Sequence, residues 1–453
     1  MKLRKQDTEF SHLPLFSTDE KPKHEKIKNV SRVRAVLGMI QFSLIWKLLM
    51  VWLCVLHFFE REYPSKKIGD CKKGDGFHLV ALIADPQIVD CTSYQDRFWL
   101  TNYITEKVSD NYLHRNYKYI QKNLDPDTIV FLGDLFDGGR DINTKAWLKE
   151  YKRFNRIFPK KENRRNIQSI PGNHDIGFEK MDVNVLNRFA SFFGYADRVI
   201  EIANYSFIFL DTISLSSKDE GIRNRSAEFL DNIHKWLDPS KPRILLTHVP
   251  LFRQNKIEGC GPLREKKTLF PIQKGIQYQT VIDEQLLKEI LNKIKPFLIF
   301  SGDDHDYCEI AHEGNDGEAI KEITVKSISM TSGIKYPAIQ LLQLNTPDTD
   351  GLPRSDTYMC LLPPPYSALK FYAFFYVSFI LILLASYFKQ FARNLGFVKK
   401  GIQQYLPCNN NFTPRHTNRV PYVVKELTQE IAVNIVFLSS LCYAALSIYY
   451  STV

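Results

Sequence analysis

Five short apolar runs of this chain are each followed by a side chain that can bind a metal ion or transfer a proton. These side chains are Asp85, Asp134, Asn173, His248 and Asp303. A single case is ordinary, because an Asp after a strand is usually a turn residue or a helix N-cap, and a lone His is usually structural. Five in succession predict one shared site, since the carboxyl ends of parallel strands meet at one edge of a sheet.

From residue 77 onward, short β-rich runs alternate with longer helical stretches. Strands are predicted at 78–84, 128–132, 167–170, 206–210, 243–246 and 297–300, and helices near 97–123, 141–157, 181–193, 225–237 and 280–293. This alternation predicts an α/β fold with buried sheets. The stretch 253–279 has no clear periodicity, and a long loop of this kind is usually either functional or disordered.

The polar residues after the strands form a series of motifs. In order, they are Asp85-Pro-Gln87, Gly-Asp134-Leu-Phe-Asp137, Gly-Asn173-His174-Asp175, Thr-His248 and Gly-Asp303-Asp304-His305. This series resembles the calcineurin-like metallophosphoesterases, across roughly residues 77–330. The resemblance implies a sandwich of two mixed β-sheets flanked by helices, with a two-metal centre at the strand ends. With the N-terminal apolar run included, the chain resembles the fungal cell division control branch of this family, which is related to enzymes that remodel GPI-anchor glycans after attachment.

The resemblance also implies the ligands of the two metal ions. They are Asp85, Gln87, Asp134 and His305 for one ion, and Asp134, Asn173, His248 and Asp303 for the other. Gln87 stands where the family usually has His, and Asp303 stands where the last motif usually reads Gly-His-x-His. Either change could weaken a site. We interpret both as tuning, because oxygen donors form a harder ligand set that favours Mn²⁺ or Mg²⁺ over Zn²⁺.

The expected chemistry is hydrolysis of a phosphate ester. Two divalent ions about 3.5–4 Å apart share a bridging hydroxide, lower its pKa and clamp the phosphoryl oxygens of an in-line displacement. His174 is expected to stabilise developing charge or to protonate the leaving oxygen, and Asp137 to orient His174. We interpret Asp175 as a helix N-cap and assign no role to Asp304 and Asp306.

Three apolar runs, at 36–59, 371–388 and 431–450, are long enough to cross a bilayer as helices. The first follows a long tail and lacks a small-residue cleavage site, which argues against a cleaved signal peptide. The alternative for the other two is that they are buried core helices.

The formal net charge is +10, and Lys and Arg concentrate beside these apolar runs. That pattern is typical of cytosolic flanks of membrane spans and not of a nucleic-acid-binding groove. The positive-inside rule therefore predicts a cytosolic basic tail at 1–35, a luminal metallophosphoesterase domain at 60–367 and a basic cytosolic loop at 389–430. We expect a multi-pass membrane protein of the endoplasmic reticulum or early Golgi. The compartment follows from the expected substrate, not from a retrieval signal.

A lumen permits disulfides, and the predicted luminal domain carries five cysteines: Cys71, Cys91, Cys260, Cys308 and Cys360. We hypothesise that Cys260 pairs with Cys308 and ties the long loop to the last motif. The sequons at Asn204 and Asn224 would then be glycosylated.

A luminal domain with spans on both sides is held near the bilayer, so substrates attached to lipid are expected. The family resemblance makes this specific: the phosphodiester between ethanolamine and a mannose of a GPI anchor. Two alternatives remain. One is a phosphodiesterase for another lipid headgroup or a nucleotide, and the other is a non-catalytic membrane protein that senses or buffers Mn²⁺.

Several aromatic residues could form the floor of a glycan site, but their helical or loop spacing favours core packing. They are Tyr94, Phe98, Trp99, Tyr103, Phe252 and Tyr278.

Overall fold

The computed structural model describes residues 38–179, 181–254, 259–314, 317–345, 354–404 and 419–451, with side chains left out at 393–404 and 419–424. The chain forms two compact units, Met1–Trp52 with Phe375–Ala444, and Leu53–Phe374 with Ala445–Val453. The second unit contains all the motifs. The predicted tail at 1–35, and residues 405–418 of the predicted cytosolic loop, lie outside the described residues.

The motif-bearing unit is built on two β-sheets. The first has the order β11-β10-β1-β2-β3, and its strands are β1 (His78–Ile83), β2 (Thr128–Phe131), β3 (Arg165–Ile167), β10 (Ala338–Leu344) and β11 (Ser355–Leu361). The second has the order β4-β5-β6-β7-β9-β8, and its strands are β4 (Arg198–Ile202), β5 (Tyr205–Phe209), β6 (Arg243–Leu246), β7 (Leu298–Ser301), β8 (Cys308–Glu313) and β9 (Ala319–Thr324). Both sheets are mixed: β1, β2 and β3 are parallel, as are β5, β6, β7 and β9, whereas β10 is antiparallel to its neighbours β1 and β11, β4 to β5, and β8 to β9. The predicted fold class is confirmed.

The central strands are apolar along their whole length because both of their faces are buried. On β1, Val80 and Leu82 belong to the cluster between the sheets, which also includes Phe207 of β5. The alternate residues Ala81 and Ile83 belong to the cluster that contains the surrounding helices. Strand alternation therefore builds two apolar layers from one continuous run.

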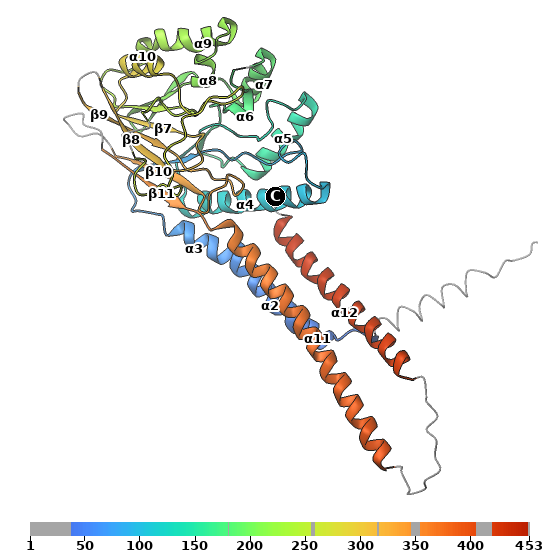
Figure 1. Cartoon of the computed structure of the whole chain (residues 1–453). Helices are drawn as coiled ribbons and strands as arrows, with labels where there is room; N and C mark the ends of the chain where they lie inside the picture. Colours follow the sequence, from blue (N-terminus) through green and yellow to red (C-terminus); the bar gives the residue numbers. More distant parts are fainter. Residues whose placement is uncertain are drawn as a thin grey trace, which may run out of the picture. The chain divides into compact units, whose positions relative to one another are not determined.

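Helices cover the outer faces of the sandwich. They are α4 (Trp99–Tyr119), α5 (Thr144–Ile157), α6 (Asn173–Ile176), α7 (Val183–Phe193), α8 (Thr212–Leu215), α9 (Glu220–Asp231) and α10 (Glu284–Ile294). Figure 1 shows α4 and α5 on the opposite side of the sheets from α9 and α10. Asn143 caps α5 by accepting a hydrogen bond from Ala146 N, and Asp182 caps α7 in the same way from Asn184 N.

The predicted strand at 167–170 is wrong in its position. β3 ends at Ile167, which pairs with Val130 of β2. β2 continues for only one more residue, Phe131, and Gly133 and Asp134 then turn the chain with φ of 95° and 50°. Residues 168–172 instead carry the chain out of the sheet and toward α6.

Three helical stretches are long and apolar enough to cross a membrane: Phe42–Gly69, Pro365–Ala392 and Lys425–Tyr450. They are formed by α2 (Phe42–His57), η1 (Phe58–Glu62) and α3 (Tyr63–Gly69), by α11 (Pro365–Gln404) and by α12 (Arg419–Tyr450). The last two bury only 22% of their most apolar window. The alternative of buried core helices is therefore wrong. The first stretch begins and ends later than the predicted 36–59.

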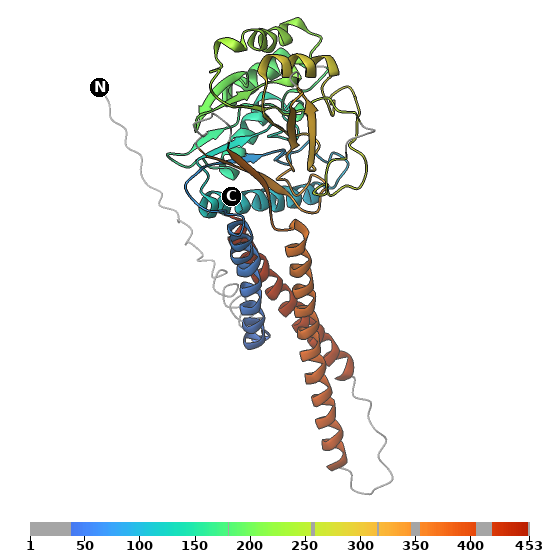
Figure 2. The same cartoon turned by 90° about the vertical axis from the view of Figure 1, so that its left-hand side faces the viewer.

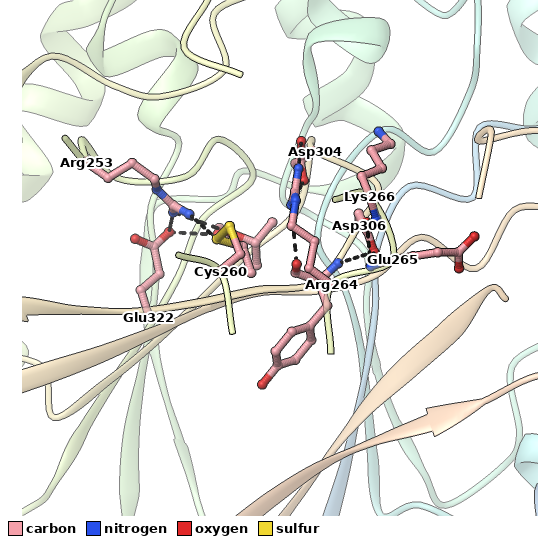
Figure 3. Close-up of a disulfide and its surroundings, with 12 residues drawn as sticks. Arg253, Cys260, Arg264, Glu265, Lys266, Asp304, Asp306 and Glu322 are labelled. Carbon is pink, nitrogen blue, oxygen red and sulfur yellow. Dashed lines mark hydrogen bonds and ion pairs between the residues drawn. A yellow bond between two sulfur atoms is a disulfide. The ribbon is translucent and has the colours of Figure 1, made fainter. Parts of the chain in front are cut away.

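Two disulfides fasten the motif-bearing unit. Cys260–Cys308 confirms the predicted pair, and Figure 3 shows it beside the last motif. Cys71–Cys360, which the sequence did not indicate, joins the end of α3 to β11 across 289 positions. Cys91 is free and exposed.

We expect the Cys71→Ala/Cys360→Ala variant to lose more thermal stability than the Cys260→Ala/Cys308→Ala variant. The two bonds close loops of 289 and 48 positions. Loop entropy then gives roughly 5–6 kcal/mol for the first and roughly 4 kcal/mol for the second. Thermal unfolding of the full chain in lipid nanodiscs measures the difference. Non-reducing peptide mapping checks the pairing, and a free thiol at Cys71 or Cys260 would contradict it.

Candidate metal centre

The strand ends bring the predicted ligands to one buried edge. Asp85 follows β1, Asp134 follows β2 and His248 follows β6. One potential ligand atom from each of these three side chains lies within 4.8 Å of the other two, and all three side chains are buried. The cluster therefore joins the two sheets at the carboxyl ends of their parallel strands, where α/β folds bind ligands.

His248 is oriented as a metal ligand. Its Nδ1 donates to the Leu132 carbonyl over 2.7 Å. Its Nε2 lies 3.5 Å from Asp134 Oδ1, 3.6 Å from Asp303 Oδ1 and 3.4 Å from Asn173 Oδ1. A backbone bond at one ring nitrogen commonly leaves the other free to bind a metal. The four predicted ligands of the second ion thus converge on one point.

The predicted ligands of the first ion lie next to those of the second ion. Gln87 Nε2 donates to Asp134 Oδ2 over 2.9 Å, and rotation of this amide would present Oε1 to the same space. Ser327 holds two ligand loops together, since its Oγ donates to Asp85 O and its N–H to His305 O. Asp85 Oδ2 is buried and accepts no hydrogen bond from any residue that the structure describes. A buried carboxylate oxygen without a donor fits a cation ligand.

The backbone at these positions is strained. Of the ten described non-glycine residues with positive φ, five are predicted ligands: Asp85, Gln87, Asp134, Asp303 and His305. This conformation costs L-residues about 1–2 kcal/mol each. Such strain persists where the surrounding fold imposes it, typically at functional sites.

The electrostatics favour positive charge at the cluster. Burial raises the pKa of Asp85 well above its usual range, and His248 opposes this. Burial lowers the pKa of His248, but Asp134, Asp303 and Asp85 outweigh it and raise that pKa to about 10. Burial also lowers the pKa of His305, which favours the neutral imidazole that binds metals. These donors fit a divalent metal pair.

His174 lies beside this cluster. Its Nδ1 donates to Asp137 O over 2.6 Å and lies 3.3 Å from Asp137 Oδ1, so Asp137 holds the ring. Nε2 is therefore the ring nitrogen available to a substrate. Burial lowers the pKa of His174, but Asp134 and Asp137 outweigh it and raise the pKa to about 10.

Asp175 is not the N-cap that the sequence suggested. Gly172 occupies that position, and Asp175 is the third residue of α6. Its carboxylate accepts hydrogen bonds from the N–H groups of Gly172, Leu135 and Phe136, at 2.9, 3.0 and 3.0 Å. It therefore binds the loop that carries Asp134 to the helix that carries Asn173.

Asp304 and Asp306, which had no assigned role, hold the long loop in place. Arg264 forms an ion pair with Asp304 at 2.5 Å. Asp306 Oδ2 accepts from the backbone N–H groups of Glu265 and Lys266 at 2.9 and 2.7 Å. Figure 3 shows this arrangement beside the Cys260 disulfide. The described part of the loop is thus fastened to the last motif.

Two further contacts escaped the sequence analysis. Arg140 Nη1 donates to Asn173 O, and Arg140 N donates to His174 O, each over 2.9 Å. The Asn173 side-chain amide donates to Gln277 O over 3.3 Å, which directs its Oδ1 toward His248. No motif signals these residues, because their partners lie on other loops.

We expect Gly172→Ala to impair metal binding while the protein still folds. A Cβ at Gly172 would lie 2.0 Å from Asp134 Oδ1, whereas a Cβ at Gly259 meets no atom within 4 Å. Displacing the bridging ligand should cost at least about 10- to 100-fold in metal affinity, the range seen when a metal ligand's support is lost. Metal titration of both variants in the full chain measures this. Equal affinity for Gly172→Ala and Gly259→Ala would contradict it.

Comparison with known proteins agrees with this geometry. The calcineurin-like phosphoesterase family matches residues 78–307. Cell division control protein 1 of Saccharomyces cerevisiae is 46% identical over 353 residues, covering 73% of this chain and 71% of that protein. Metallophosphoesterase 1 of Xenopus laevis is 30% identical over 249 residues, covering 48% of this chain and 59% of that protein. Metallophosphoesterase 1 of Rattus norvegicus is 26% identical over 306 residues, covering 62% of this chain and 73% of that protein. The chain belongs to the calcineurin-like metallophosphoesterase family.

Proposed function

We propose that this protein is a divalent-metal-dependent phosphodiesterase of the secretory-pathway lumen that removes ethanolamine phosphate from a mannose of GPI anchors. The observation that carries the proposal is the buried group of Asp85, Asp134 and His248, with His174 bound to the same Asp134 loop. Family membership supports the reaction class. The GPI substrate rests on the motif resemblance and on the candidate spans that adjoin the domain.

The donor set suits Mn²⁺. The seven predicted ligands comprise three carboxylates, two amide oxygens and two imidazoles, and a set rich in oxygen favours Mn²⁺ or Mg²⁺ over Zn²⁺. When bound, two such ions supply Lewis acidity toward the phosphoryl oxygens and a nucleophile at neutral pH. Asp134 lies between the two ligand groups, hydrogen-bonded to Gln87 of one and 3.5 Å from His248 of the other.

A side chain of the protein donates the proton that the leaving oxygen needs. Water adds to phosphorus and the bond from phosphorus to the mannose oxygen breaks, so that oxygen needs a proton. His174 supplies it from Nε2, since Asp137 holds Nδ1. The N–H of His174 also donates to Asp134 Oδ1 over 2.8 Å, which fixes the acid relative to the metal ligands.

Two features support a luminal domain, and a third supports its position near the membrane. The motif-bearing unit contains two disulfides, which persist in oxidising compartments. The acceptor residues of its two sequons, Asn204 and Asn224, are exposed, which leaves room for an attached glycan. Helices able to span a membrane precede and follow the domain, which keeps the site near lipid-attached substrates.

The first test measures hydrolysis by the full chain in nanodiscs, stripped of metal and then given Mn²⁺, Mg²⁺ or Zn²⁺. The substrates are a GPI-type ethanolamine-phosphate mannoside and a generic aryl phosphodiester. We expect Mn²⁺ to restore cleavage of the mannoside. Cleavage of the aryl ester alone would reject the GPI substrate and keep the enzyme. Failure with both, with two ions bound, would favour the Mn²⁺-sensing alternative.

The second test separates proton transfer from metal binding. We expect His174→Ala to lower kcat by about 10²–10⁴, the usual contribution of general acid–base catalysis, with metal content unchanged. Asp134→Ala should lose both activity and metal. His234→Ala is the matched control, because His234 is exposed on the short helix η3 (Ile233–Lys235). Full activity in His174→Ala would exclude His174 as the acid.

A further inference from the structure

The start of α4 exposes a group of large apolar side chains. Their exposed fractions are 64% for Phe98, 68% for Trp99, 42% for Leu100, 51% for Tyr103 and 52% for Ile104. The sequence-based expectation that Phe98, Trp99 and Tyr103 pack in the core is wrong, as it is for Tyr278 at 44%. The second half of α4 is buried against the sandwich, whereas this first half extends beyond it. Exposed apolar clusters of this kind mark interaction sites.

Helix geometry shows which way this stripe faces. Leu100, Ile104, Val108, Asn111 and Arg115 follow one another at intervals of three or four residues and therefore share a face of α4. At the far end of this face, Asn111 Nδ2 and Arg115 Nη1 donate to Glu60 Oε2 over 3.0 and 2.8 Å. The exposed residues Leu100 and Ile104 therefore lie on the same face of α4 as Asn111 and Arg115, which bind Glu60.

Glu60 lies in the last part of the first candidate span, which ends at Gly69, and it lines a cavity with Pro365 and Tyr450, where the second span begins and the third ends. It lies in η1, the direct continuation of α2, and Tyr372 of α11 donates to its Oε1 over 2.6 Å. Phe59 stacks on Phe371 with 5.0 Å between ring centroids, and Phe58 stacks on Tyr63 at 6.0 Å. Aromatic side chains gathered at the ends of apolar helices are typical of the membrane–water interface.

A second contact fixes α4 at the same level. Tyr112 Oη donates over 2.8 Å to the carbonyl of Pro363, two residues before α11 begins. Val108 lines one small cavity with Glu60, Pro365 and Tyr450, near the end of α12. In both perpendicular views α4 runs crosswise to α3 and to the first turns of α11 (Figures 1 and 2).

We propose that the first half of α4 is an interfacial helix that rests on the lipid bilayer, with Leu100 and Ile104 inserted among the acyl chains and Phe98, Trp99 and Tyr103 at the headgroups. Continuity with the span ends selects lipid as the occupant. The flanking cations agree, since Arg97 stacks over Tyr94 at 3.7 Å and Lys107 lies 5.8 Å from the Tyr103 ring. An apolar stripe with interfacial aromatic and basic residues is typical of helices that lie in the plane of a bilayer.

This contact sets the height of the metal centre above the lipid. Asp110 of α4 forms an ion pair with Arg153 of α5 at 2.7 Å. Arg153 also donates to the carbonyl of Val89 over 2.6 Å, two residues after the predicted ligand Gln87. A helix held on the bilayer therefore holds the Gln87 loop at a fixed distance from it.

The test places an environment-sensitive fluorophore on Ile104→Cys in the full chain, with Cys54, Cys91, Cys408 and Cys442 replaced by Ser and both disulfides kept. The protein is reconstituted at one copy per nanodisc, with or without lipids that carry a nitroxide near the headgroup. Trp236→Cys is the matched control, because Trp236 is 52% exposed next to η3, away from α4.

We expect the nitroxide lipids to quench the label at Ile104 and to leave the label at Trp236 unchanged. Equal quenching at the two sites would overturn the proposal. A label at Ile104 that lipid does not quench, but that becomes shielded as protein concentration rises in detergent, would also overturn it and identify an interface between copies. This arm does not depend on catalysis.

A second arm rests on the proposed function. Leu100→Asp/Ile104→Asp should lower turnover of a phosphodiester presented on vesicles while turnover of a soluble aryl phosphodiester stays unchanged. Loss of both would point to misfolding, which the quenching arm distinguishes, since it needs no aspartate. Unchanged turnover of the vesicle substrate would show that the contact with lipid does not serve catalysis.

Discussion

Three carboxylates converge on one buried edge of the sandwich, and the rest of the motif-bearing unit is arranged around them. Asp85, Asp134 and Asp303 all raise the pKa of His248. One oxygen of Asp85, one oxygen of Asp134 and one ring nitrogen of His248 lie within 4.8 Å of one another. At an effective dielectric constant of 20, two unit charges 4 Å apart interact by about 4 kcal/mol. Such repulsion is relieved either by protonation, which the raised pKa of Asp85 favours, or by positive charge between the carboxylates. A bound pair of divalent ions would supply that positive charge, held by these same carboxylates.

The loops that carry these carboxylates are held by hydrogen bonds to backbone groups as well as by apolar packing. Asp175 accepts from three N–H groups, and two of them belong to the residues directly after Asp134. Gly172 has no side chain because Asp134 Oδ1 occupies the space where its Cβ would lie. The left-handed conformation of five predicted ligands turns the chain sharply after the strands. The strain at these turns is tolerated because the paired strands before them and the loop fastened by Cys260–Cys308 fix the positions of the backbone on both sides.

The junction between the sandwich and the span ends has a different character. Glu60 and Arg115 form a buried ion pair at 2.8 Å, completed by Asn111 and Tyr372. A buried pair of this kind adds little net stability, but loss of one partner is costly because the other charge remains buried. It therefore specifies one way for α4 to meet the ends of α2 and α11. That specificity lets an apolar stripe on α4 lie against lipid at a defined level.

The sequence by itself determined what depends on local pattern. Continuous apolar runs predicted buried strands, and polar residues directly after them predicted one edge where ligands gather, because parallel strands bring their carboxyl ends together. The long apolar runs predicted helices able to span a membrane. These signals lie within a few neighbouring residues.

Only the tertiary structure decided what depends on partners far apart in the chain. β10 pairs with β1 across more than 250 positions, and Cys71 joins Cys360 across 289. The sequence predicts Asp175 as a helix cap, but the fold brings the N–H groups of Leu135 and Phe136 to its carboxylate. The sequence also predicts Trp99 as a core residue, but α4 begins beyond the sandwich and leaves this side chain exposed. In each case the residue type permits several partners, and the free energy that selects one comes from packing of the whole domain.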